Sequence, residues 1–254
     1  LYVRLSFQSI WYDWDLDGWQ DLYVINDKNG ENALYHNQGN GQFNEIASSV
    51  GANVVLDAMT ASMGDFNQDG YQDIFMTSTV VGNNGIGSLL LVGSESGQYQ
   101  EASEEYGLNF IRYCWGAAWM DVDNDTDLDL FVAESEPLEP FQENYLYKNN
   151  GPFIFNPPFS EEDGNYVMEP FDVDVYALDY LNSNTVVTGD FDRNGWVDFV
   201  VHNTYNHKAR IWMNSGFNDA APKYIQLGKQ GIISNTMGAV SYTPLRPHET
   251  DSYL

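Results

Sequence analysis

Four short stretches of the sequence place oxygen-bearing side chains at the same spacing. Their sequences are DWDLDGWQD from Asp13, DFNQDGYQD from Asp65, DVDNDTDLD from Asp121 and DFDRNGWVD from Asp190. Aspartate or asparagine occupies positions one, three, five and nine of every stretch, and glycine occupies position six of three of them. Carboxylates packed so closely repel one another unless a cation lies between them. The spacing therefore predicts four loops that each coil around one metal ion, although four solvated acidic turns are the alternative.

Calcium is the metal that this ligand pattern favours. The side chains at positions one, three, five and nine and the backbone carbonyl at position seven supply many oxygen ligands, which suits Ca²⁺, whereas Mg²⁺ keeps more water. The loops contain no Cys or His, which argues against zinc and copper. An EF-hand begins with the same spacing, but it requires flanking helices and a glutamate at position twelve. We expect about four structural Ca²⁺. The predicted ligands are Asp13, Asp15, Asp17, Trp19 and Asp21; Asp65, Asn67, Asp69, Tyr71 and Asp73; Asp121, Asp123, Asp125, Asp127 and Asp129; and Asp190, Asp192, Asn194, Trp196 and Asp198.

Strands must position these loops. Each loop leads into a short apolar run, LYVIND from Leu22, IFMTST from Ile74, LFVAES from Leu130 and FVVHNT from Phe199. These runs are rich in β-branched and aromatic residues, which is typical of strands. A small-residue strand precedes each loop, and two further strands follow. Four strands per repeat make one blade of a propeller, whose sheet must stack on its neighbours. The sequence therefore predicts an all-β fold, a β-propeller of about four four-stranded blades that form an incomplete ring.

Composition narrows the function classes. The chain has 254 residues, 43% apolar content and a formal net charge of −27, so it can form a sizeable core but repels nucleic acid and anionic membranes. No apolar run is long enough to span a membrane. The single cysteine, Cys114, excludes an internal disulfide, and we expect it to pack in the core. The chain starts at Leu1 rather than Met, so we expect the native N-terminus, with any signal peptide, to lie beyond it.

These repeats resemble the FG-GAP, or VCBS-type, repeats of integrin-α-like β-propellers. The resemblance covers residues 7 to about 217 and includes the metal loop, the DLYV-type strand that follows it and the LYHNQGNGQF hairpin. It implies that the metal loops lie on one rim of the propeller. It also implies that the ligand-facing loops, which join the second strand to the third and one blade to the next, lie on the opposite side.

The C-terminal part of the chain carries a second resemblance. Residues 224–240, YIQLGKQGIISNTMGAV, are similar to the opening of an ASPIC/UnbV domain of the cartilage acidic protein-like family. The following residues do not continue that module. We therefore expect three segments: propeller blades over 1–217, the start of a truncated ASPIC/UnbV domain over 218–240, and a non-native tail over 241–254.

Catalytic residues are not predicted. The sequence contains no nucleophile elbow, phosphate loop or zinc signature, and none of the four histidines has an acid partner that the sequence makes obvious. We therefore expect a secreted, calcium-binding module, extracellular or at the cell surface, that binds a protein or glycan on the face opposite the calcium loops. The variable segments 78–87, 134–144 and 156–184 are where its specificity should reside. The alternative is a propeller-type enzyme, such as a polysaccharide lyase, with catalytic groups in insertions or outside this chain.

Overall fold

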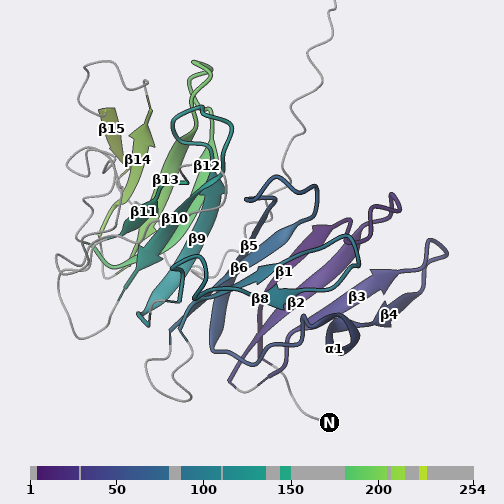
Figure 1. Cartoon of the computed structure of the whole chain (residues 1–254). Helices are drawn as coiled ribbons and strands as arrows, with labels where there is room; N and C mark the ends of the chain where they lie inside the picture. The colour runs from purple at the N-terminus through teal and green to yellow at the C-terminus, as the bar shows by residue number, and fades with distance from the viewer. Residues whose placement is uncertain are drawn as a thin grey trace, which may run out of the picture.

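Within the described residues the strands form four antiparallel sheets (Figure 1), and one of the four acidic loops joins the first strand of each sheet to the second. The computed structural model describes residues 5–28, 30–79, 87–109, 111–135, 144–149, 181–204 and 207–214, and the backbone of 223–227. None of the helices within these residues has the length and hydropathy needed to cross a membrane.

The first two sheets contain four strands each. The first is formed by β1 (Leu5–Tyr12), β2 (Asp21–Asp27), β3 (Ala33–Asn37) and β4 (Phe43–Glu45), and the short helix α1 (Ala47–Val50) follows it. The second is formed by β5 (Ala58–Gly64), β6 (Asp73–Ser78), β7 (Leu89–Val92) and β8 (Gln100–Glu101). Neighbouring strands in the chain are neighbours in each sheet, and each pair is antiparallel.

The other two sheets repeat this order. The third is formed, within the described residues, by β9 (Cys114–Met120), β10 (Asp129–Glu134) and β11 (Tyr145–Tyr147). The fourth is formed by β12 (Ser183–Gly189), β13 (Asp198–Asn203), β14 (Ala209–Met213) and β15 (Lys223–Leu227). The predicted all-β fold of propeller blades is confirmed. Most of the predicted segments 218–240 and 241–254 lie outside the described residues, but the backbone of β15 pairs with β14 and so extends the fourth sheet past residue 217.

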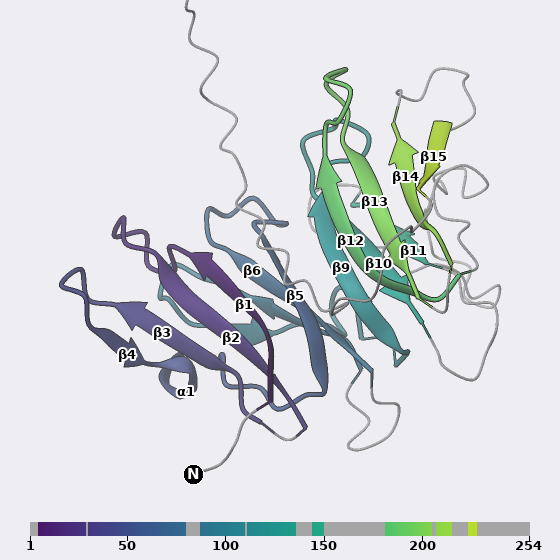
Figure 2. The same ribbon diagram turned by 180° about the vertical axis from the view of Figure 1, so that it is seen from behind.

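The sheets stack in chain order, from purple to green in Figures 1 and 2. Their first strands meet one another, because β5 lies against β1 and β9, and β9 lies against β12. Small residues permit this approach. A Cβ atom at Gly116 in β9 would lie 2.8 Å from the Cα of Thr185 and 2.9 Å from the carbonyl oxygen of Asn184 in β12. The small-residue strands are therefore the inner strands of the blades, as the sequence predicts.

Three hydrophobic clusters hold consecutive sheets together. Tyr23 and Leu34 of the first sheet pack with Met76 of the second. The second cluster joins the second and third sheets and buries Cys114, as predicted. The third cluster joins the third and fourth sheets through Phe131. Every residue of β6 and β10 is buried, and apolar residues occupy the positions that follow the first aspartate, IFM in β6 and LFVA in β10.

Candidate metal centres

The ninth residue of each loop is an aspartate that begins the second strand of its sheet and has 0% exposed surface. One oxygen of this carboxylate accepts a hydrogen bond from the backbone N–H of the residue at loop position two. The other oxygen accepts a hydrogen bond from a backbone N–H at the end of the third strand or within two residues after it. These carboxylates therefore join the loop to two strands. The bonds to Asp21 come from Trp14 (2.8 Å) and Asn37 (2.7 Å), those to Asp73 from Phe66 (3.1 Å) and Gly93 (2.9 Å), those to Asp129 from Val122 (2.9 Å) and Asn149 (2.9 Å), and those to Asp198 from Phe191 (2.7 Å) and Asn214 (2.7 Å).

The first residue of each loop closes the turn. In the second loop, Asp65 accepts hydrogen bonds from the backbone N–H groups of Asp69 and Gly70, both at 2.9 Å. The third and fourth loops repeat both bonds, and the first loop repeats the second of them. Positions four and six have positive φ angles in all four loops, so the predicted tight turn at position six is confirmed.

Carboxylates converge within these turns. Each of three groups has one carboxylate oxygen per residue within 4.8 Å of the others; the groups are Asp13, Asp15 and Asp17; Asp121, Asp123 and Asp129; and Asp190, Asp192 and Asp198. Oxygens Oδ1 of Asp13 and Asp123 are buried and accept no hydrogen bond within the described structure. The predicted metal ligands of the second and fourth loops are all oxygen atoms, which fits the preference of Ca²⁺.

The residue at position seven contacts its own loop through a backbone hydrogen bond. The backbone N–H of this residue donates to the side chain at position five in every loop, as Tyr71 does to Asp69 at 2.9 Å. The side chain of Asp127 turns to the neighbouring loop, where it accepts a hydrogen bond from Gln68 at 2.6 Å. The metal-binding role of the backbone carbonyls of Trp19, Tyr71, Asp127 and Trp196 stays a prediction.

The electrostatics of the loops favour a bound cation. Burial raises the pKa of both Asp73 and Asp129 to about 8, although two backbone N–H groups partly oppose this shift. Burial also raises the pKa of Asp65 and Asp121. The protein alone therefore disfavours the charged form of these carboxyl groups. A divalent cation among them would stabilise that form.

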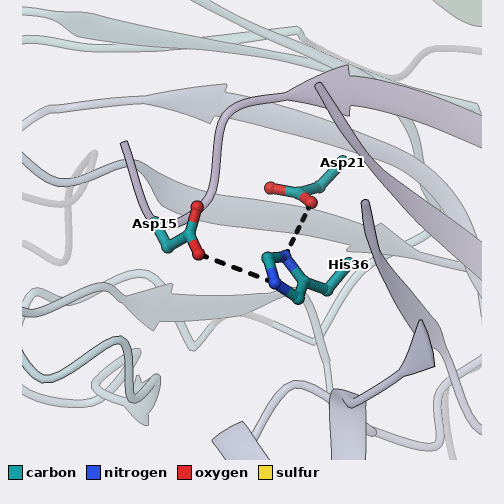
Figure 3. A group of neighbouring side chains, drawn as sticks. All are labelled: Asp15, Asp21 and His36. Carbon is teal, nitrogen blue, oxygen red and sulfur yellow. Dashed lines mark hydrogen bonds and ion pairs between the residues drawn. The ribbon is translucent and has the colours of Figure 1, made fainter. Parts of the chain in front are cut away.

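Two loops contain a further side chain that the sequence reasoning missed. His36 lies at the end of β3, with Nδ1 at 3.1 Å from Asp21 Oδ1 and Nε2 at 3.7 Å from Asp15 Oδ2 (Figure 3). The expectation that no histidine has an obvious acid partner is therefore wrong for His36. In the third loop, the ammonium group of Lys148 contacts Asp123 and Asp125. The four residues at this place, His36, Val92, Lys148 and Met213, share no residue type, so no repeated motif marks them in the sequence.

A known repeat family matches the part of the chain that contains the first two acidic loops. Residues 13–76 match the family model described as FG-GAP-like repeat, and the match begins at the first predicted ligand, Asp13. This stretch of the chain is therefore similar to an FG-GAP-like repeat. The match extends from the first metal loop through the second, so two of the four loops lie within the FG-GAP-like region.

Relatives resemble the chain over most of its length. It is 29% identical over 229 residues to cartilage acidic protein 1 of Xenopus tropicalis, 28% identical over 230 residues to that of Mus musculus and 27% identical over 230 residues to that of Homo sapiens. Each alignment covers 88% of this chain but only 30–31% of the relative, so the chain spans about a third of their length. Among solved structures, the V. cholerae biofilm matrix protein Bap1 aligns with a TM-score of 0.40 and 13% identity, covering 84% of this chain and 38% of that one.

The third acidic loop has threonine where the others have glycine. Thr126 has a φ angle of 78°, a conformation that costs an L-residue roughly 1–2 kcal/mol. Its hydrogen bonds to Asp121 and Gln68 use backbone atoms, so glycine would keep both. We expect Thr126→Gly to raise the free energy of unfolding by about 1 kcal/mol in urea denaturation. The reverse change, Gly70→Thr, should lower it by a similar amount, and a Thr126→Gly variant no more stable than wild type would contradict this account.

The predicted variable segments lie mainly outside the described residues. The structure describes residues 78, 79 and 87 of the first segment, 134, 135 and 144 of the second, and 181–184 of the third. Their role in the FG-GAP-like repeats stays a prediction.

Proposed function

We propose that the chain is a calcium-stabilised recognition module that acts outside the cell and binds a protein or glycan. The observation that carries this proposal is the repetition of one loop geometry in four blades. A buried carboxylate at position nine joins each loop to its sheet, and three carboxylates converge in each of the first, third and fourth loops. Calcium bound there would neutralise the carboxylates and fix the connection between the first and second strands of a blade.

We propose that the partner binds at the rim opposite the calcium loops. Because adjacent strands are antiparallel, the connection between the second and third strands lies at the other end of each sheet. In the first blade this connection is held firmly: Asn32 accepts a hydrogen bond from the backbone of Asn26 at 2.8 Å, and the Asn26 side chain donates to the carbonyl of Glu31 at 2.7 Å. Loops of variable sequence on such a rigid scaffold are suited to specific binding.

The relatives support an extracellular setting. Their name, cartilage acidic protein 1, is that of an acidic protein of cartilage, and this chain is also strongly acidic, with a formal charge of −27. A surface of that charge favours partners that are neutral or basic over nucleic acid and anionic membranes. We propose recognition without catalysis, with calcium acting through the structure of the blades.

A binding assay with loop variants tests this function. The chain is applied to arrays of polysaccharides and extracellular matrix proteins in calcium and in chelator. We expect binding in calcium that is lost in chelator and lost when residues 80–86 and 136–143 are replaced by Gly-Ser linkers. Asn40→Ala, an exposed change in the turn between β3 and β4, serves as the control and should keep binding. Polysaccharide cleavage that disappears with Asp21→Ala would replace recognition with an enzyme function.

A further inference from the structure

The end of the third strand brings a different residue to the metal loop in each blade. The backbone N–H that binds the buried carboxylate belongs to Asn37, Gly93, Asn149 and Asn214. The residues immediately before these four therefore occupy equivalent places. They are His36, Val92, Lys148 and Met213. Only the third blade places a cationic ammonium group at this point.

Lys148 binds the same carboxylates that would bind calcium. Its ammonium nitrogen contacts Asp123 Oδ2 and lies 3.5 Å from Asp125 Oδ2. It therefore contacts the predicted calcium ligands at loop positions three and five. The Asp123 side chain is 10% exposed and that of Lys148 is 21% exposed. The pair is therefore largely shielded from water, and salt screens such a pair less than it screens surface charges. The contact is therefore a partly buried ion pair and not a loose surface one.

The rest of the third loop does not compensate for this cation. Asp127 adds a carboxylate, but it bonds with Gln68 of the neighbouring loop. Thr126 holds a conformation that glycine adopts more readily. A calcium ion entering the loop would have to displace the ammonium group from two carboxylates, or bind next to a like charge. In the second and fourth loops, the apolar side chains of Val92 and Met213 offer no such competition.

We propose that the ammonium group of Lys148 takes the place of Ca²⁺ in the third loop, so that the chain binds three calcium ions, in its first, second and fourth loops. This inference rests on the proposed calcium binding of the other three loops. It differs from the sequence expectation of about four ions by one. It also gives the third loop a cation of its own when calcium is scarce.

Calcium titration of the 254-residue chain and its Lys148→Met variant tests the proposal, because methionine is the natural residue at this place in the fourth blade. We expect three Ca²⁺ per wild-type chain and four per variant chain, measured by equilibrium dialysis with the metal alone. In chelator, the variant should melt at a lower temperature than wild type, because its carboxylates lose their cation. Added calcium should restore that loss.

A second pair of variants keeps the test decisive if Lys148→Met folds poorly. Asp123→Ala and Asp15→Ala remove the side-chain oxygens at position three of the third and first loops. We expect Asp123→Ala to keep three bound Ca²⁺ and Asp15→Ala to bind two. Four Ca²⁺ on the wild-type chain, or a loss of one ion in Asp123→Ala, would overturn the role of Lys148 while leaving calcium binding intact. No Ca²⁺ on any variant would overturn both this inference and the proposed calcium-stabilised function.

Discussion

Replacing Asp73 with alanine is expected to destabilise the chain strongly, even without calcium. The carboxylate is fully buried, and its two oxygens accept the backbone N–H groups of Phe66 and Gly93. Alanine leaves both donors without a partner in a buried place, and each orphaned donor costs about 1–3 kcal/mol. We expect the free energy of unfolding to fall by roughly 4 kcal/mol, measured by urea denaturation in chelator.

Two matched variants separate this effect from charge. Asp69→Ala removes an exposed carboxylate from the same loop and should cost about 0.5 kcal/mol in chelator. Asp73→Asn keeps one acceptor oxygen, so its free energy of unfolding should lie between those of the two alanine variants. If Asp73→Ala and Asp69→Ala lowered the free energy of unfolding equally, the buried aspartate would not join the loop to the sheet.

Replacing Trp119 with alanine is expected to cost about 3–5 kcal/mol, because it opens the interface between the second and third sheets. The indole is 7% exposed and stacks on Phe66, with ring centroids 5.6 Å apart and planes 5° from parallel. Its Nε1 also donates a hydrogen bond to the carbonyl of Ser62 in β5 at 3.1 Å. Removing the ring leaves a cavity and an unpaired carbonyl between two blades. Thermal and urea denaturation should both report the loss.

Trp11→Ala is the control for that substitution. Trp11 is 49% exposed and contacts Phe43 edge to face at 6.2 Å. Its removal should cost about 1 kcal/mol or less, since it buries little area and supports one aromatic pair. A Trp119→Ala variant as stable as Trp11→Ala would contradict the assignment of the second cluster as the contact that holds these blades together.

The sequence was sufficient to predict the blades and the loops because both are local patterns. Aspartates at fixed spacing, glycine at position six and an apolar run after position nine all lie within about fifteen residues. The structure adds why position nine is invariably aspartate in the four repeats: it binds two backbone N–H groups from different segments, as Asp129 does with Val122 and Asn149. Spacing alone predicts a metal ligand there, not a structural link.

The roles of His36 and Lys148 depend on the register between the third strand and the loop. In the first sheet, β3 pairs with β2 so that Tyr35 lies opposite Leu22, which brings His36 to the buried carboxylate of Asp21. No short motif specifies that register, so neither residue is marked as a loop contact in the sequence. The same limit applies to Trp119, whose partner Phe66 lies in another blade. The sequence predicts that the blades must stack on one another, but it does not predict which side chains meet between them.

Calorimetric titration of the wild-type chain with Ca²⁺ tests the central claim most directly. The loops should bind calcium with dissociation constants in the weak extracellular range of roughly 10⁻⁴–10⁻³ M, and the melting temperature should rise with calcium concentration. Magnesium at the same concentration should give a smaller increase, because it gives up its bound water reluctantly. Binding heat together with thermal stabilisation is the predicted result. The absence of both would show that the four acidic loops are solvated turns and would contradict the account.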